Sequence, residues 1–327
     1  MKKNLQLVKD KNGYQFFFLK LGMFIFICFM IDISIGTILR SLYLKQNSGW
    51  EYRTKYAVEA TTADMLLFGS SRAQQQYNPT FFEDRLNLSC YNVGRDGESI
   101  LYQYTIFSSV INRYKPKIIL LECENGMFRK TADAYDKLSC FLPFYKTHPE
   151  IRSMIELRGP NEKLKLMSKI YPYNSLILKM ISGVYNKNKD EDIKGYLPLY
   201  GNMNEPMRSV NYTKTYILDS NKIKFYNSFI DICKRNKIEL VLVCSPYFSK
   251  GTGNDISLTM AKDIALKNDV KFIDLSKGHP LLNQSTLYDD TAHVNLMGAK
   301  ILSNIVIDSM KVNKYIESNK YMLTKTN

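Results

Sequence analysis

A serine, a histidine and an aspartate in this chain have the residue types and spacing needed for nucleophilic attack on an ester. Such attack requires a base, nearly always a histidine, and a third group that orients the imidazole. The chain has only three histidines, and His293 follows Asp290 by three positions in "YDDTAHVNLMGAK". Side chains three apart on a turn can lie on one side, where the carboxylate fixes the imidazole tautomer that faces a hydroxyl.

The other two histidines have weaker sequence support as a catalytic base. His148, in "THPE", has only Glu150 near it, and His279, in "GHP", is typical of a turn. An alternative remains open for His293 as well, because Asp290 could cap the helix that follows and leave His293 on the surface.

The candidate nucleophile lies in "FGSSRAQQQ", directly after the apolar run 64–68. Two serines and a glycine after a strand are ordinary turn material, so this stretch by itself indicates only a polar turn. Whether one of these serines can be a nucleophile depends on the strands and helices that would bring the stretch close to the histidine.

The pattern of apolar runs predicts those elements. Short apolar runs alternate with amphipathic segments of helical period, which favours an α/β fold with a doubly wound, flavodoxin-like parallel sheet of about five strands. The expected strands are 64–68, 89–93, 117–122, 238–246 and 270–276, and the expected helices are 79–87, 100–113, 222–236, 255–268 and 296–310.

Polar clusters follow four of these strands. They are Gly69-Ser70-Ser71, the segment "NVGRDG" (92–97), Asn125 in "ECEN", and Asp290 with His293. Because the carboxyl ends of parallel strands share one edge of the sheet, we expect all four clusters to meet there.

At this point the chain resembles the SGNH (GDSL-like) hydrolase superfamily, in particular its membrane-anchored bacterial members that act on acylated cell-envelope polysaccharide. The resemblance covers residues 63–126 and 237–311. The family's Gly-Asp-Ser block reads Gly69-Ser70-Ser71 here, which implies that Ser71 is the nucleophile and that Ser70 replaces the aspartate. The family's Asp-x-x-His block matches Asp290 and His293, which implies the rest of the triad.

The resemblance also implies an oxyanion hole. Gly97 matches the family's second-block glycine, whose backbone N–H binds the oxyanion. The third block departs from the family's Gly-x-Asn-Asp and reads Glu122-Cys123-Glu124-Asn125-Gly126, so Asn125 is the candidate side-chain donor. Arg72, beside the nucleophile, is a candidate for binding an anionic substrate, with a surface salt bridge as the alternative. No cofactor and no metal is expected.

The N-terminal segment 16–39 is apolar except for Lys20 and Asp32 and is long enough to span a bilayer. No small-residue cleavage site follows, so we expect an uncleaved signal anchor. The expected division is a cytoplasmic tail (1–15), the transmembrane anchor (16–39), a polar stem (40–62), the SGNH-like domain (63–311) with a helical insertion (127–215) serving as a lid, and a basic tail (312–327). This places the catalytic domain outside the bacterial cytoplasmic membrane.

The composition indicates which classes of binding partner and which cysteine chemistry to expect. The net charge of +14 comes from scattered lysines without a basic stripe, which disfavours nucleic acid and favours an anionic membrane or polysaccharide. The six cysteines lack paired short spacings, so neither a disulfide framework nor a zinc site is expected.

These features predict a serine-dependent ester hydrolase or O-acyltransferase that acts on an acylated cell-envelope glycan or a related ester, at the lipid bilayer and beside other polysaccharide-synthesis proteins. The alternative is a catalytically inactive, membrane-anchored protein that binds glycan or assists its assembly. Nucleotide binding by residues 92–97 is disfavoured, because only Gly94 and Gly97 fit the glycine-rich fingerprint.

Overall fold

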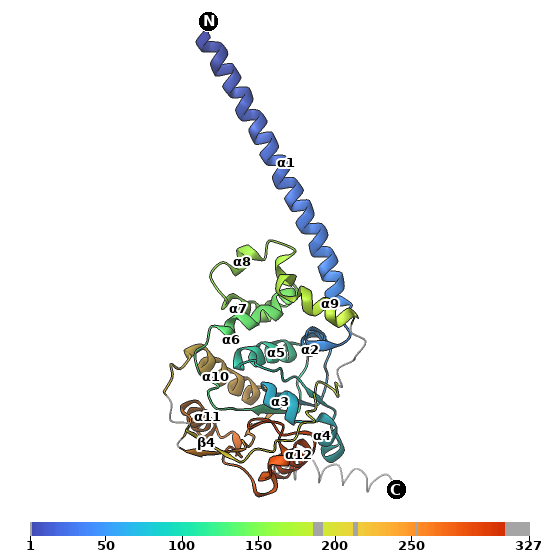
Figure 1. The fold of residues 1–327 in the computed structure, drawn as a ribbon, viewed down its shortest axis with the longest axis vertical. Helices are drawn as coiled ribbons and strands as arrows, with labels where there is room; N and C mark the ends of the chain where they lie inside the picture. Colours follow the sequence, from blue (N-terminus) through green and yellow to red (C-terminus); the bar gives the residue numbers. More distant parts are fainter. Residues whose placement is uncertain (1, 186–191, 212–214, 253, 311–327) are drawn as a thin grey trace.

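The computed structural model describes residues 2–185, 192–211, 215–252 and 254–310. A long helix, α1 (Lys2–Leu44), projects from one end of an α/β domain (Figure 1). Its segment Gly13–Leu44 is long and apolar enough to cross a membrane, and an 18-residue window within it has a mean hydropathy of 2.3. The expected segment 16–39 lies within this helix.

The centre of the domain is a parallel sheet of five strands in the order β2-β1-β3-β5-β7, which confirms the predicted fold class. This is the flavodoxin-like order, with its switch point between β1 and β3. The strands are β1 (Met65–Phe68), β2 (Cys90–Asn92), β3 (Ile118–Glu122), β5 (Glu239–Cys244) and β7 (Lys271–Asp274).

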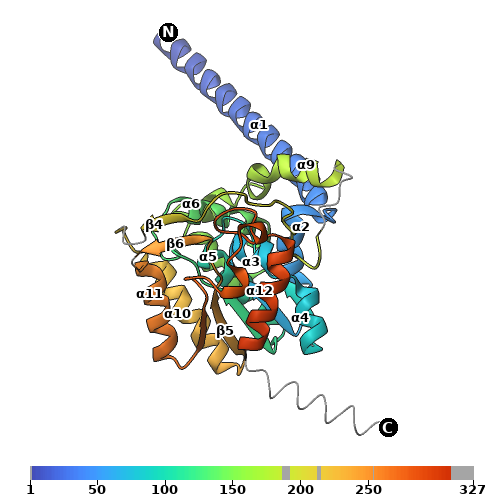
Figure 2. The ribbon, with the colours of Figure 1, turned by 60° about the horizontal axis from the view of Figure 1, so that its bottom comes forward.

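Helices cover both faces of the sheet (Figure 2). Successive side chains of β1 point to opposite faces, so Leu66 and Phe68 join one buried cluster and Met65 and Leu67 the other. The first cluster includes α2 (Gly49–Glu59), α5 (Ile100–Arg113), α10 (Ser220–Arg235) and α11 (Ile256–Lys267), and the second includes α4 (Pro79–Leu86) and α12 (Leu296–Ser309).

Residues 40–62 differ from the expected polar stem. Helix α1 continues to Leu44, and α2 packs on α5 with Ala57 and Val58 fully buried in the core. The physical reason is that the domain buries charged residues of α2 together with Ala57 and Val58, and each charge has an ion-pair partner, Arg95 for Glu51 and Asp192 for Arg53.

The insertion 127–215 is helical in its first part and extended in its second. The extended part runs beside the sheet edge, where Leu197 N–H donates to Gln74 O and Met203 N–H donates to Tyr288 O. A two-stranded parallel sheet, β4 (Arg208–Asn211) with β6 (Ser249–Thr252), was not predicted. The helical elements are α6 (Asp133–Asp136), η1 (Lys137–Phe144), η2 (Pro149–Ile151), α7 (Arg152–Glu156), α8 (Glu162–Lys165), η3 (Tyr171–Leu176) and α9 (Ile177–Tyr185). The expected basic tail 312–327 lies outside the described residues.

Candidate active site

Ser71 is placed by a tight turn between a strand and a helix. Strand β1 ends at Phe68, and Ser71 is the first residue of α3 (Ser71–Gln76). Between them Gly69 has a φ of +153°, and a Cβ atom there would lie 2.7 Å from the Cβ atoms of both Ala73 and Glu122. Only glycine fits this turn, which holds Ser71 at the carboxyl edge of the sheet, at the switch point.

His293 reaches Ser71 from the loop before α12, 222 positions away. Its Nε2 lies 2.8 Å from Ser71 Oγ, and its Nδ1 lies 2.9 Å and 3.0 Å from the two carboxylate oxygens of Asp290. The three predicted residues are therefore hydrogen-bonded in series. This arrangement is able to draw the proton from the serine hydroxyl onto an oriented imidazole.

Asp290 orients the whole turn that carries the histidine. Its Oδ1 also accepts hydrogen bonds from the N–H groups of Ala292 (2.7 Å) and His293 (2.9 Å). The cap of α12 is instead Asn295, whose side chain accepts from Gly298 N–H. The alternative in which Asp290 caps that helix is thus excluded.

The pKa of the Asp290 carboxyl is held below its ordinary value. Burial alone would raise this pKa, but the hydrogen bonds from the His293 ring and from the N–H groups of Ala292 and His293 outweigh it. The carboxylate therefore stays ionised beside the imidazole, as an orienting group must.

A cavity of about 210 Å³ opens at Ser71 and is lined in part by Gly97, Glu98 and Glu124. Gly97, with a φ of +69°, is held by a 2.8 Å hydrogen bond from Lys137 Nζ to its carbonyl oxygen. Ser71 N–H lies in the first turn of α3 and has no acceptor within that helix. Ser71 and Gly97 thus line one cavity, which is the placement that their backbone N–H groups would need to form an oxyanion hole.

Two glutamates at the end of β3 line this cavity, and each is held by a different partner. Glu122 is buried and forms an ion pair with Arg72 at 3.1 Å, and it accepts further hydrogen bonds from Ser245. Glu124 accepts a 2.7 Å hydrogen bond from Ser70 Oγ. Burial raises the pKa of Glu124, although the hydrogen bond from Ser70 and the charge of Arg72 oppose this.

Arg72 does not lie where a substrate-binding residue would. It is only 2% exposed, and its guanidinium donates to Glu122, to Ser245 and to the carbonyl oxygen of Ala292 while stacking on the Tyr247 ring at 3.7 Å. The expectation that Arg72 binds substrate is corrected here, because the side chain is buried and all three guanidinium nitrogens donate to protein groups.

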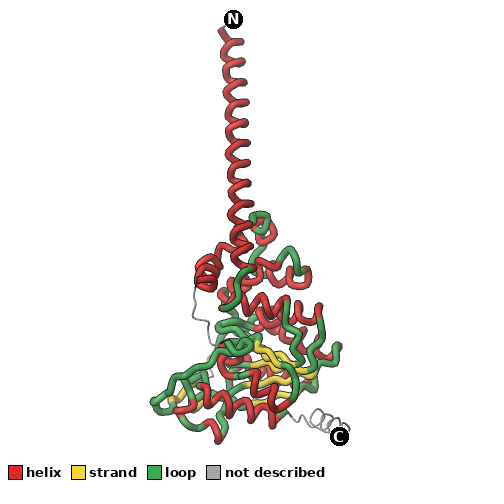
Figure 3. The backbone as a smooth tube through the Cα atoms, turned by 90° about the vertical axis from the view of Figure 1, so that its right-hand side faces the viewer, coloured by secondary structure: helices red, strands yellow, loops and turns green. Residues whose placement is uncertain are grey.

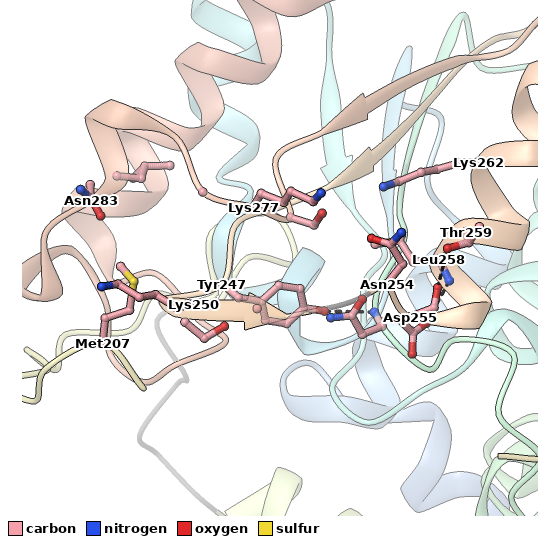
Figure 4. A pocket seen from close by; sticks show the side chains of 16 residues that line it. Met207, Tyr247, Lys250, Asn254, Asp255, Leu258, Thr259, Lys262, Lys277 and Asn283 are labelled. Carbon is pink, nitrogen blue, oxygen red and sulfur yellow. Dashed lines mark hydrogen bonds between the residues drawn. The ribbon is translucent and has the colours of Figure 1, made fainter. Parts of the chain in front are cut away.

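Asn125, the expected side-chain donor, is not among the residues that line the Ser71 cavity. Its backbone N–H donates to Tyr247 Oη at 3.1 Å, and it lines a second cavity of about 330 Å³ on the other side of the turn. Figure 4 shows that cavity, with Lys250, Lys262 and Lys277 around it. The oxyanion site proposed below therefore consists of the two backbone N–H groups alone.

The other histidines serve local structure. His148 Nδ1 bonds Thr147 Oγ1 at 2.8 Å, and His279 caps a short helix by accepting from Leu281 N–H. Within the described ranges no group of three His, Cys, Asp or Glu side chains is placed to hold a metal ion.

Two residues that the sequence did not single out support the triad. Gln76 donates to Ala292 O at 3.0 Å, and the buried Asn92 side chain donates to the carbonyls of Ala73 and Tyr77, which fixes α3. Gln76 follows Arg72 by four positions, which places both on one face of α3. This spacing was the available sequence signal that Gln76 would contact the same loop as Arg72.

No family model and no curated protein matches the chain. Among solved structures, it resembles a putative acylhydrolase from Bacteroides fragilis, with 12% sequence identity, a TM-score of 0.40, and coverage of 82% of this chain and 99% of that one. At this identity and TM-score the likeness says nothing about activity, and the geometry of the site has to be considered by itself.

Proposed function

We propose that this protein is a serine-dependent esterase or O-acyltransferase whose nucleophile is Ser71. The observation that carries the proposal is the continuous hydrogen-bonded series from Ser71 Oγ through His293 to Asp290 at the mouth of a cavity. Series of this kind activate a hydroxyl that is otherwise too weak a nucleophile at neutral pH.

In the proposed reaction, His293 takes the Ser71 proton as Ser71 Oγ attacks the ester carbonyl. The N–H groups of Ser71 and Gly97 stabilise the oxyanion, each contributing on the order of 3 kcal/mol to lowering the barrier. His293 then returns the proton to the leaving alcohol. The acyl-enzyme is resolved by water in an esterase, or by a sugar hydroxyl in an acyltransferase.

The size of the cavity favours a short acyl group. A volume of about 210 Å³ lies below the roughly 300–1,000 Å³ of pockets that enclose drug-sized ligands. The acylated cell-envelope glycan is proposed from the resemblance of the sequence motifs and from the apolar helix of the same chain, which can anchor the domain to a membrane.

The packing of the end of α1 against the domain supports an uncleaved anchor over a cleaved signal peptide. The last part of the helix belongs to the folded domain, where Leu39 and Tyr43 are buried and Tyr43 packs on Phe144 and Tyr173. Cleavage would remove part of this core. We therefore propose a single-pass membrane protein of the bacterial cytoplasmic membrane with its catalytic domain outside.

The test uses a fluorophosphonate probe and an aryl acetate on the full chain. Labelling and hydrolysis are expected in the wild type and in Ser70→Ala, and are expected to disappear in Ser71→Ala and His293→Ala. Ser70 is the matched control, since it is the adjacent serine in the same cavity. Labelling that persists in Ser71→Ala contradicts the assignment. Adding an acetylatable glycan then separates transfer from hydrolysis.

One observation favours the alternative of an inactive glycan-binding protein. The third block supplies a carboxyl, Glu124, to the cavity and directs Asn125 to another one. A folded wild type that neither labels nor turns over ester would support that alternative.

A further inference from the structure

The insertion surrounds the point where α1 leaves the domain. Helices α8 and α9 lie at the end of the molecule from which α1 projects (Figures 1 and 3), and α1 contacts both α9 and η3. This end of the insertion therefore faces whatever medium surrounds α1.

Two residues of α1 fix it to the insertion. The Asp32 carboxylate accepts hydrogen bonds from Ser168 Oγ (2.5 Å) and from the N–H groups of Lys169 (2.7 Å) and Ile170 (3.2 Å). One turn later, a Cβ atom at Gly36 would lie 2.4 Å from Lys169 Cβ, so only glycine allows this approach. The helix is thus clamped to residues 168–170.

The clamp sets the membrane boundary. Irregular backbone such as 168–170 does not lie exposed in hydrocarbon, so the acyl chains must end on the N-terminal side of Asp32. The apolar part from Gly13 to Ile31 then spans about 28 Å at 1.5 Å per residue, close to the ~30 Å of a bilayer core.

Large apolar side chains are exposed on the insertion beside this boundary. The exposed fractions are 67% for Leu164, 73% for Met167, 82% for Leu178 and 45% for Ile181. Exposed lysines alternate with them at positions 163, 165, 169 and 179. Apolar side chains that enter the acyl boundary, mixed with lysines for anionic headgroups, are the composition of an interfacial membrane contact.

We infer that segment 163–181 of the insertion is a second membrane-binding surface, which inserts its apolar side chains into the headgroup region of the anionic leaflet that α1 crosses. This inference rests on the proposed anchor. It goes beyond the anchor because α1 in the bilayer and segment 163–181 at its surface would together hold the domain in one orientation, with the clamp joining the two. The insertion begins as a wall of the Ser71 cavity, at Met127 and Thr131, so that cavity would lie at a constant height above the lipid.

The test places a tryptophan at single exposed positions of the full chain, reconstituted in vesicles of phosphatidylcholine and phosphatidylglycerol that carry brominated acyl chains. The variants are Met167→Trp, Leu178→Trp, Phe24→Trp within α1, and Leu266→Trp as the matched control. Leu266 is 81% exposed, as Leu178 is, but lies on α11. The single native tryptophan, Trp50, is present in every variant and gives a constant background.

The added fluorescence is expected to be quenched by brominated lipid at positions 24, 167 and 178 and to remain at position 266. Quenching at 24 with none at 167 and 178 overturns the inference while leaving the anchor intact, and a protein partner would then cover this surface. Absence of quenching at position 24 overturns both. Neither result depends on ester turnover, so failure of the proposed chemistry is distinguished by the Ser71 assay.

Discussion

Arg72 Nη1 donates a 3.1 Å hydrogen bond to the carbonyl oxygen of Ala292, and so joins the residue after the proposed nucleophile to the residue before its base. The same guanidinium reaches Glu122 at the end of β3 and Ser245 after β5. Gln76 donates to the same Ala292 oxygen at 3.0 Å. The distance from Ser71 to His293 therefore depends on donors from α3.

Gln76→Ala tests this dependence with the least damage to the fold. We expect kcat to fall about fivefold with KM unchanged, because one lost hydrogen bond of about 1 kcal/mol loosens the His293 turn. Arg72→Met is a poorer test, since it leaves Glu122 buried without its partner, at a cost of about 3–5 kcal/mol in stability. The measurement is steady-state hydrolysis of an aryl acetate together with urea unfolding.

The control is Gln46→Ala. Gln46 is also buried and donates to a backbone carbonyl, that of Met180, but far from Ser71. If Gln76→Ala loses no more kcat than Gln46→Ala, the positioning role of Gln76 is wrong.

The sheet and the candidate triad were predictable because their signals are local. Uniformly apolar runs mark buried parallel strands such as β3, and the order of strand exits brings Ser71 and His293 to one edge. Helix α5 was predicted at its observed bounds, 100–113, because Ser99 caps it and its apolar face has a helical period.

The residues that were misplaced depend on contacts distant in sequence. The burial of Arg72 requires partners 50, 173 and 220 positions away, none of which its neighbours in the chain indicate. The backbone N–H of Asn125 donates to the hydroxyl of Tyr247, 122 positions later. Likewise the burial of the charged residues of α2 depends on distant partners, since Glu51 pairs with Arg95 and Arg53 pairs with Asp192.

Asp290→Asn is expected to lower kcat by roughly a thousandfold or more, because the amide no longer fixes the imidazole tautomer that faces Ser71. The matched control is Asp289→Asn, whose carboxylate bonds Gly201 N–H instead. Equal losses of kcat in both variants would contradict the orienting role of Asp290.

Because the pKa of Asp290 is below its ordinary value of 3.8 in the folded state, its ionised form contributes stability above that pH, and this stability is lost as the pH falls further.

Gly69→Ala should destabilise the turn that presents Ser71. The φ of +153° is one that alanine rarely adopts, and its Cβ atom would meet Ala73 and Glu122 at 2.7 Å. We expect a loss of about 1–3 kcal/mol in unfolding free energy together with loss of activity. Gly159→Ala is the control, since nothing lies within 4 Å of a Cβ atom there. The measurement is urea unfolding, and a similar midpoint for both variants would refute the steric argument.

The burial of Glu98, in the wall of the Ser71 cavity, predicts that the free energy of unfolding depends on pH. Its side chain is 4% exposed, and its Oε2 has no hydrogen-bond partner among the described residues. Burial raises the pKa of Glu98 to about 7, with Arg95 and Lys137 only partly opposing it. Because the folded state then binds this proton more tightly than the unfolded state, the unfolding free energy should fall as the pH rises from 4.5 to about 7.

The expected fall is about 3 kcal/mol, at 1.36 kcal/mol for each pKa unit. Glu98→Gln carries no titrating proton, so this part of the pH dependence should vanish and the variant should gain stability relative to wild type above pH 7. Urea unfolding below pH 4.5 and above pH 7 measures it. Glu59→Gln, which removes the same charge from an exposed site at the end of α2, should keep the wild-type slope. A Glu98→Gln slope equal to that of wild type would show that this carboxyl is ionised in the folded protein throughout the range.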